Sequence, residues 1–239
     1  MYDFQRQKQE WSRPPIDDVG YISSAELLRK SDKELLEIIR QMEITRYSHQ
    51  GWRNYRGLWR KHLGHDTTTD KTILDFGCGV GLEALQFAPV NQVLAADIVP
   101  DNVALTERVV RLFGYEVTAT MISEHYPYLS IDQVDIFYCN GVLHHIPYAA
   151  DVLRWAAGVS KEIRLMLYSD RGWEKYVGVS APPVNLDIHD HPQFERFVRV
   201  FDQVGSYADW YSEEKIRYRF PFLELKSFNY ITDDDRYCV

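Results

Sequence analysis

The sequence predicts an α/β protein of three layers, in which helices cover both faces of a mostly parallel sheet. Two observations predict this class. From residue 71 onward, short apolar stretches with strand character alternate with stretches of helical spacing. Strands separated by helices imply right-handed crossovers, which leave the strands parallel. The 239 residues suffice for one large domain of this kind with additions.

Seven strands are expected in this sheet, and all but one should be parallel. The stretches with strand character are residues 72–76, 92–98, 116–122, 134–139, 163–168, 222–231 and 236–239. Helices are expected between them at residues 82–87, 101–113 and 149–159. Asp233 and Asp234 predict a hairpin turn, so the last strand should run antiparallel and insert beside the fifth.

Residues 1–70 precede the sheet and are expected to form an arm and a helical cap. Residues 1–20 are polar, contain adjacent prolines and predict an extended or loose arm. Ser31 and Glu34 have the spacing of a capping box, which predicts the start of a helix. Residues 51–63 mix aromatic and apolar residues with arginines, and they predict a short amphipathic helix with a basic face.

Residues 171–220 interrupt the alternation within the domain of residues 71–239. This segment is rich in tryptophan, tyrosine and phenylalanine. Two helices are expected in it, at about residues 191–204 and 212–220. Its aromatic side chains could bracket a sugar or a planar substrate, or they could form a small satellite core under a long connection.

Composition and charge limit the function. The formal net charge is −8, and an acidic chain is a poor partner for nucleic acid, which requires a positive footprint. Cys78, Cys139 and Cys238 form no CxxC pair, so neither a zinc site nor a disulfide framework is expected. His189 and His191 lack a third ligand, so we expect no metal. Without a signal peptide or an apolar membrane span, a cytoplasmic location without membrane contact is expected.

The strongest local signal runs from Ile73 to Gly81 and reads Ile-Leu-Asp-Phe-Gly-Cys-Gly-Val-Gly. A strand leads directly into three alternate glycines and then into a helix. Glycine allows a tight turn and lets a ligand lie against bare peptide groups. Open α/β sheets bind ligands at the carboxyl ends of their strands, where helix N-terminal donors add to the site. A nucleotide-like ligand is therefore expected at this loop.

Two ligand classes use such a loop. The stretch from Gly79 to Ala84 satisfies the dinucleotide pattern G-x-G-x-x-A, which leaves a nicotinamide-dependent oxidoreductase as an alternative. Asp75, however, stands two residues before the first glycine, and the string D-x-G-x-G-x-G resembles motif I of the Rossmann-like class I S-adenosylmethionine-dependent methyltransferases. The stretch from Val134 to Pro147, with its Leu-His-His-Ile sequence, resembles the motif IV region of that family. A non-catalytic module that retains the fold is a further alternative.

The resemblance implies a cofactor, S-adenosylmethionine, with S-adenosylhomocysteine as product. Asp97 ends the second predicted strand, where a carboxylate accepts hydrogen bonds from both ribose hydroxyls. Ile98 should pack on adenine, and Asn140 should lie near the reactive end of the cofactor. Arg46 is the first choice among the N-terminal arginines to pair with the methionine carboxylate. The expected cofactor-binding residues are Arg46, Asp75, Gly77, Cys78, Gly79, Asp97, Ile98, Ile122, Ser123 and Asn140.

The cofactor implies transfer of a methyl group to a nucleophile that the enzyme aligns with it. A general base helps when the nucleophile is a hydroxyl, and the candidates are His144, His145, His189 and His191, although the first two could be architectural. Amine and nucleobase methyltransferases often show N/D-P-P-F/Y after the fourth strand, whereas this sequence reads Asn-Gly-Val-Leu from Asn140. A hydroxyl of a small molecule or glycan is therefore the expected acceptor. Residues 171–220 fall where the family commonly places its substrate cover.

Overall fold

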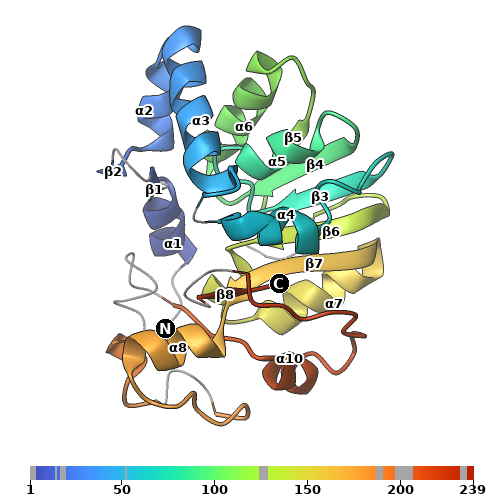
Figure 1. Ribbon diagram of the computed structural model, residues 1–239. Coiled ribbons are helices and arrows are strands. Elements are labelled where there is room, and N and C mark those ends of the chain that lie inside the picture. Colours follow the sequence, from blue (N-terminus) through green and yellow to red (C-terminus); the bar gives the residue numbers. More distant parts are fainter. Residues whose placement is uncertain are drawn as a thin grey trace.

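A six-stranded sheet runs through the molecule, with helices on both of its faces (Figure 1). The structure is a computed structural model that describes residues 4–13, 15–16, 20–51, 53–123, 129–186, 191–196, 207–231 and 236–239. The strands of the sheet are β3 (Thr72–Phe76), β4 (Gln92–Asp97), β5 (Thr118–Met121), β6 (Val134–Asn140), β7 (Ser160–Tyr168) and β8 (Tyr237–Cys238). A separate ribbon pairs β1 (Pro15–Ile16) with β2 (Gly20–Tyr21).

Helices connect and flank these strands. They are α1 (Phe4–Trp11), α2 (Ser24–Arg29), α3 (Asp32–Tyr47), α4 (Leu58–Leu63), α5 (Leu82–Phe87), α6 (Pro100–Leu112), α7 (Ala149–Val159), α8 (Asp170–Val177) and α10 (Glu213–Arg219), with short 3-10 turns η1 (Tyr55–Gly57) and η2 (Leu143–His145). The predicted helices at residues 82–87 and 149–159 are confirmed at both ends as α5 and α7. The predicted capping box is confirmed at the start of α3, where the Glu34 amide donates to Ser31 Oγ and the Ser31 amide donates to Glu34 Oε2.

The strand order β5-β4-β3-β6-β7-β8 places a switch point beside β3. The chain moves outward from β3 through β4 to β5, and then returns to pair β6 with the other side of β3. Open α/β sheets bind ligands outside the carboxyl ends of the strands at such a point. The topology alone therefore places the site at the ends of β3, β4 and β6.

The central strands β3 and β6 are largely apolar, and they are buried on both faces of the sheet. Ile73 and Tyr138 pack with the helices α3 to α6, whereas their neighbours Leu74 and Phe137 pack with α7 on the opposite face. Successive residues of a strand point to opposite faces, so a continuous apolar run is what a doubly covered parallel sheet requires.

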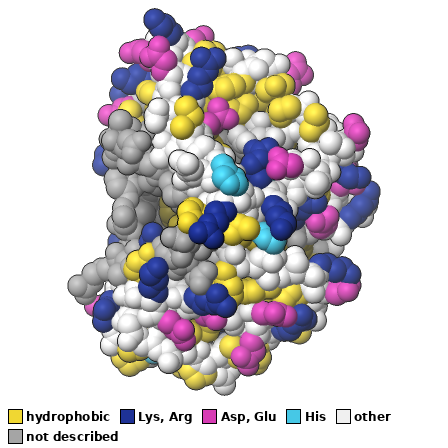
Figure 2. Space-filling model, in the orientation of Figure 1, with side chains coloured by type: hydrophobic (Ala, Val, Ile, Leu, Met, Phe, Trp, Pro, Cys, Tyr) yellow, Lys and Arg dark blue, Asp and Glu magenta, His cyan; other side chains and the backbone are white. Residues whose placement is uncertain are grey.

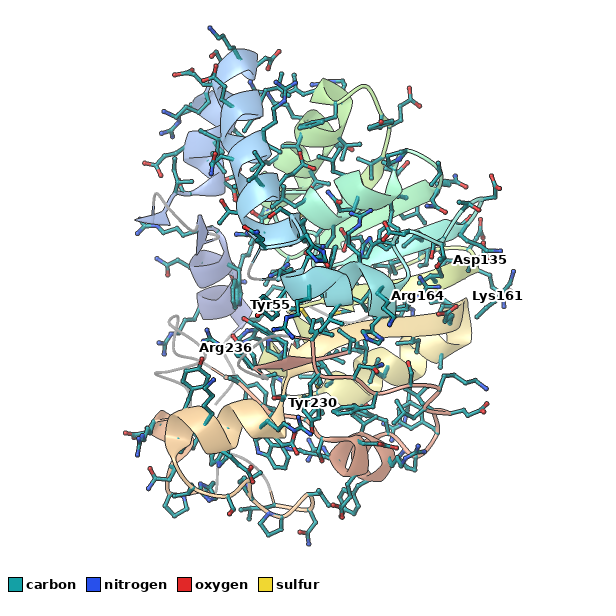
Figure 3. All side chains as sticks on the ribbon, in the orientation of Figure 1. Tyr55, Asp135, Lys161, Arg164, Tyr230 and Arg236 are labelled. Carbon is teal, nitrogen blue, oxygen red and sulfur yellow. The ribbon has the colours of Figure 1, made fainter. Side chains whose placement is uncertain are left out.

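At the amino ends of the strands, a polar side chain ties three strands together. Asp135 at the start of β6 accepts a hydrogen bond from the Thr72 amide of β3 at 3.0 Å. Its other oxygen lies 2.7 Å from Lys161 Nζ on β7, and the two side chains extend from the same end of the sheet (Figure 3). This edge lies opposite the carboxyl ends of the strands. The charges of Asp135 and Lys161 therefore contribute to the sheet and not to the ligand site.

The sheet has six strands, so the prediction of seven is wrong. Residues 222–231 do not form a strand but contribute an isolated bridge between Tyr230 and Cys238. The antiparallel pairing of the last strand beside the fifth is confirmed, because β8 pairs with β7, and residues 229–231 bond to the other side of the chain end. Because β8 has only two residues, it offers few backbone groups for pairing with residues 229–231. The predicted turn at Asp233 and Asp234 lies outside the described residues.

Two N-terminal predictions also need correction. The predicted loose arm contains the helix α1, which docks on the rest of the chain through contacts described below. The predicted helix over residues 51–63 is confined to α4, because Arg56 and Gly57 adopt left-handed backbone angles (φ 54° and 74°) that interrupt a right-handed helix. The predicted helix at residues 191–204 falls mostly outside the described residues, whereas the one at 212–220 is confirmed as α10.

Candidate active site

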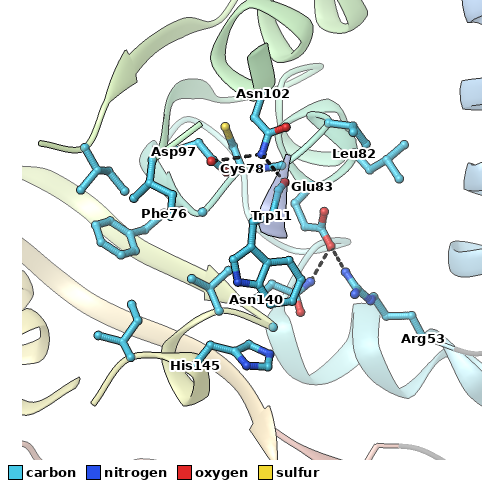
Figure 4. A pocket seen from close by; sticks show the side chains of 18 of the residues that line it. Trp11, Arg53, Phe76, Cys78, Leu82, Glu83, Asp97, Asn102, Asn140 and His145 are labelled. Carbon is cyan, nitrogen blue, oxygen red and sulfur yellow. Dashed lines mark hydrogen bonds and ion pairs between the residues drawn. The ribbon is translucent and has the colours of Figure 1, made fainter. Parts of the chain in front are cut away.

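A pocket opens at the carboxyl ends of β3, β4 and β6 (Figure 4). Most of the residues that the sequence assigned to the cofactor line it, namely Arg46, Gly77, Cys78, Gly79, Asp97, Ile98, Ile122 and Asn140. Two others do not. Asp75 is fully buried below the loop, and Ser123 is exposed and lies outside the pocket lining.

The glycine loop brings bare backbone to the pocket floor. Gly77 has φ 84°, and a Cβ atom there would clash with the side chain of Val142 from the loop after β6. A Cβ atom on Gly81 would lie 2.9 Å from Thr106 Cα of α6. Both positions therefore require glycine. Gly77 allows the contact with the loop after β6, and Gly81 allows the contact with α6.

Asp75 lies buried beneath this loop, next to the end of β3. The backbone N–H of Ala84, in the first turn of α5, favours the charged form of its carboxyl. Burial, followed by the nearby carboxylates of Glu83 and Asp97, raises the pKa of Asp75 well above its ordinary value. Asp75 therefore lies beneath the site and not in the pocket lining.

Asp97 presents its carboxylate at the end of β4. Its Oδ2 accepts from the Gly79 amide at 2.9 Å, and its Oδ1 accepts from the Val99 amide at 2.9 Å and from Asn102 Nδ2 at 3.1 Å. Burial raises the pKa of Asp97, whereas these hydrogen bonds act in the opposite direction. Three hydrogen bonds thus hold the carboxylate at the rim of the glycine loop.

A second polar cluster, centred on Glu83, forms the opposite wall. Glu83 Oε1 accepts from Tyr47 Oη, from Arg53 Nη1 and from Asn140 Nδ2, the last at 2.7 Å. Asn140 Nδ2 also lies 3.1 Å from Tyr138 Oη. Burial and the adjacent Glu83 carboxylate raise the pKa of Tyr47, so its hydroxyl keeps its proton and donates.

Sequence reasoning missed Glu83 as a functional residue. It stands in the first turn of the helix that follows the glycines, and such a position faces the ligand edge of the sheet. Arg53 belongs to the group of N-terminal arginines that the sequence offers to the methionine carboxylate, among which Arg46 is the first choice. The two arginines line the pocket from α3 and the following loop, which brings the N-terminal region into the site.

The candidate bases differ in their position relative to the pocket. His145 lines the pocket, and its Nδ1 lies 2.9 Å from the carbonyl oxygen of Tyr207. His144 is buried outside the lining, with its ring 3.8 Å from that of Tyr168, whose amide donates to His144 Nδ1. Burial lowers the pKa of His144 well below its ordinary value. His189 lies outside the described residues.

The described part of residues 171–220 forms a satellite core. Trp173 and Val177 of α8 pack with Tyr207 and Trp210 in a cluster of their own. Among described residues, none of the pocket lining comes from this segment, which reaches the site instead through the Tyr207 carbonyl.

The outer surface carries both kinds of charge. On the face shown in Figure 2, the described lysines and arginines are interspersed with acidic residues rather than gathered into a stripe. Among the helices that the structure describes, none combines the length and the apolarity that crossing a membrane requires.

Comparison with known proteins agrees with this geometry. Residues 74–162 match the family model described as a methyltransferase domain. No curated protein has a matching sequence. The fold is similar to that of a protein from Bacillus halodurans named as a candidate methyltransferase, with a TM-score of 0.53 and 19% identity over 73% of this chain and 71% of that one.

A second similar structure covers nearly the whole chain. It is magnesium protoporphyrin IX methyltransferase from Synechocystis with bound S-adenosylhomocysteine, with a TM-score of 0.52 and 14% identity over 98% of this chain and 90% of the other. At these identities the likeness concerns the fold. The family match, which contains the glycine loop, Asp97 and Asn140, shows a methyltransferase domain over residues 74–162, and the two similar structures share its fold.

Proposed function

We propose that this enzyme transfers the methyl group of S-adenosylmethionine to a hydroxyl of a small-molecule or sugar acceptor. The observation that carries the proposal is that His145 lines the same pocket as Asp97, the glycine loop and Asn140. A carboxylate that suits a ribose and a candidate general base thus share a single ligand site.

The pocket fits the cofactor through its glycine loop and Asp97. The backbone of Gly77 and Gly79 can lie against the methionine part, since neither residue has a side chain there. A carboxylate has about four lone-pair sites, and the hydrogen bonds to Asp97 leave room for a ribose hydroxyl. Ile98 and Ile122 offer apolar contact for adenine, and Arg46 offers a positive charge for the methionine carboxylate.

His145 is the base that the geometry supports best. A backbone carbonyl can only accept, so the contact with Tyr207 places the proton of the neutral ring on Nδ1. The lone pair is then on Nε2, the nitrogen that would take the proton from an acceptor hydroxyl. S-adenosylmethionine supplies an activated methyl group, and the chain has to align the nucleophile and exclude water.

The proposal is tested by methyl transfer from tritiated S-adenosylmethionine to a panel of sugars, phenols, aliphatic alcohols, amines and carboxylic acids. We expect label in hydroxyl acceptors, and we expect His145→Gln to lower kcat by about 10²–10⁴-fold with little change in S-adenosylhomocysteine affinity. The matched control is His62→Gln on α4, a partly buried histidine outside the pocket lining. Transfer to amines alone, or full activity of His145→Gln, would contradict the proposal.

A further inference from the structure

One buried side chain links the cofactor half of the pocket to the N-terminal helix. Asn102, in the first turn of α6, is 2% exposed. Its Nδ2 donates to Asp97 Oδ1 at 3.1 Å and to the carbonyl oxygen of Trp11 at 3.3 Å, while its Oδ1 accepts from Ser24 Oγ of α2. A carboxamide nitrogen has two N–H groups, so one side chain serves both acceptors.

Trp11 connects Asn102 to the part of the pocket that His145 lines. It is the last residue of α1, where backbone carbonyls have no partner inside the helix, and the Asn102 amide supplies one. Its indole ring lies against the imidazole of His145, with ring centroids 4.8 Å apart and planes tilted by 55° (Figure 4). One residue therefore has its backbone fixed beside Asp97 and its side chain against the candidate base.

The helix that carries Trp11 depends on such contacts. With eight residues, α1 is too short to be stable by itself in water, so its order depends on docking. The bond from the Ser24 amide to the Ser12 carbonyl, at 2.9 Å, holds the segment that follows it. A ligand that fixes the Asp97 carboxylate also fixes the Asn102 amide, and ordering one partner favours ordering the next.

We infer that Asn102 and Trp11 are positioning residues that couple cofactor binding at Asp97 to closure of α1 over His145. The inference rests on the proposed function, in which His145 is the acceptor base. Cofactor binding would then complete the acceptor site and shield it from water. Because coupling between sites is reciprocal, docked α1 would also strengthen cofactor binding by the same factor.

Hydrogen exchange of residues 4–13 tests this, with S-adenosylhomocysteine as the probe and calorimetry on the same samples. Couplings of this kind typically amount to about 5–150-fold, and we expect the probe to slow exchange of α1 by about tenfold in the natural chain. In Asn102→Ala the ratio of the exchange rates of α1 without and with the probe should fall to about one. A merely structural role would instead lower protection equally with and without the probe.

Two further variants keep the test decisive. Asn91→Ala removes an amide that also donates to two backbone carbonyls, those of Thr68 and Phe87, but at the opposite edge of the sheet, and it should keep the full ratio. Asn102→Ser replaces Asn102→Ala if the latter does not fold, since a hydroxyl cannot serve both acceptors. Probe binding without slower exchange, or an unchanged ratio in the Asn102 variants, would overturn the inference alone. A natural chain that does not bind the probe would overturn the proposed function as well.

Discussion

The Glu83 cluster allows a quantitative prediction about how the site is held together. Glu83→Ala removes one carboxylate oxygen that accepts hydrogen bonds from Tyr47, Arg53 and Asn140. The side chains of Arg53 and Glu83 are only 13% and 10% exposed, so water cannot replace the lost acceptor easily. The variant therefore leaves a largely buried guanidinium without its carboxylate.

The expected loss follows from this burial. Removing one partner of a buried ion pair lowers the free energy of unfolding by about 3–5 kcal/mol. A domain of this kind is stable by about 5–15 kcal/mol, so Glu83→Ala should unfold at a clearly lower denaturant concentration. Glu83→Gln keeps an acceptor oxygen but loses the charge, and it should cost about 1–2 kcal/mol.

Urea unfolding followed by circular dichroism measures both losses. The control is Glu213→Ala, which breaks the pair with Arg217 on α10, whose side chains are 54% and 58% exposed. An exposed pair contributes at most about 1 kcal/mol, so the control should differ little from the natural chain. If Glu83→Ala lost no more stability than Glu213→Ala, the cluster would not support the pocket wall as described.

Three further outcomes are expected. Gly77→Ala should lower the free energy of unfolding by about 1–3 kcal/mol and weaken S-adenosylhomocysteine binding, because the added Cβ meets Val142. The control Gly158→Ala adds its Cβ in open space, so thermal unfolding and binding should show no such loss. Burial raises the pKa of Asp75, so the folded chain holds a proton that the unfolded chain releases. The contribution of Asp75 to stability therefore falls as pH rises above its ordinary pKa of 3.8. Asp75→Asn should thus raise Tm more at about pH 8 than at about pH 5. Burial lowers the pKa of His144, so stability falls as pH drops below 6.5, and His144→Gln should reduce that slope in urea unfolding at a series of pH values.

The sheet and the glycine loop were predictable because their signals are local. Apolar runs between helical stretches predicted β3 and β6 closely, and the glycines with Asp75 predicted the position of the ligand edge. Asp97 could be found because it ends the strand next to β3. Each of these inferences depends only on residues that are neighbours in sequence or on neighbouring strands.

The rest of the site depends on contacts between distant segments. Helix α1 has no apolar run, and only its docking through Trp11 on Asn102 and His145 reveals its place. Glu83 meets Arg53 through the packing of the N-terminal helices on α5, which periodicity does not show. Of the strand predicted at residues 222–231, only residues 229–231 bond to the chain end, because β8 has two residues and offers few backbone partners.

The most direct test of the cofactor site is calorimetric titration with S-adenosylhomocysteine, with NAD as the comparison ligand. We expect the natural chain to bind S-adenosylhomocysteine and not NAD. Asp97→Ala, checked for folding by circular dichroism, should weaken the binding at least tenfold, a difference of about 1.4 kcal/mol. Binding of NAD instead, or undiminished binding of S-adenosylhomocysteine by Asp97→Ala, would contradict the role assigned to the glycine loop and its carboxylate.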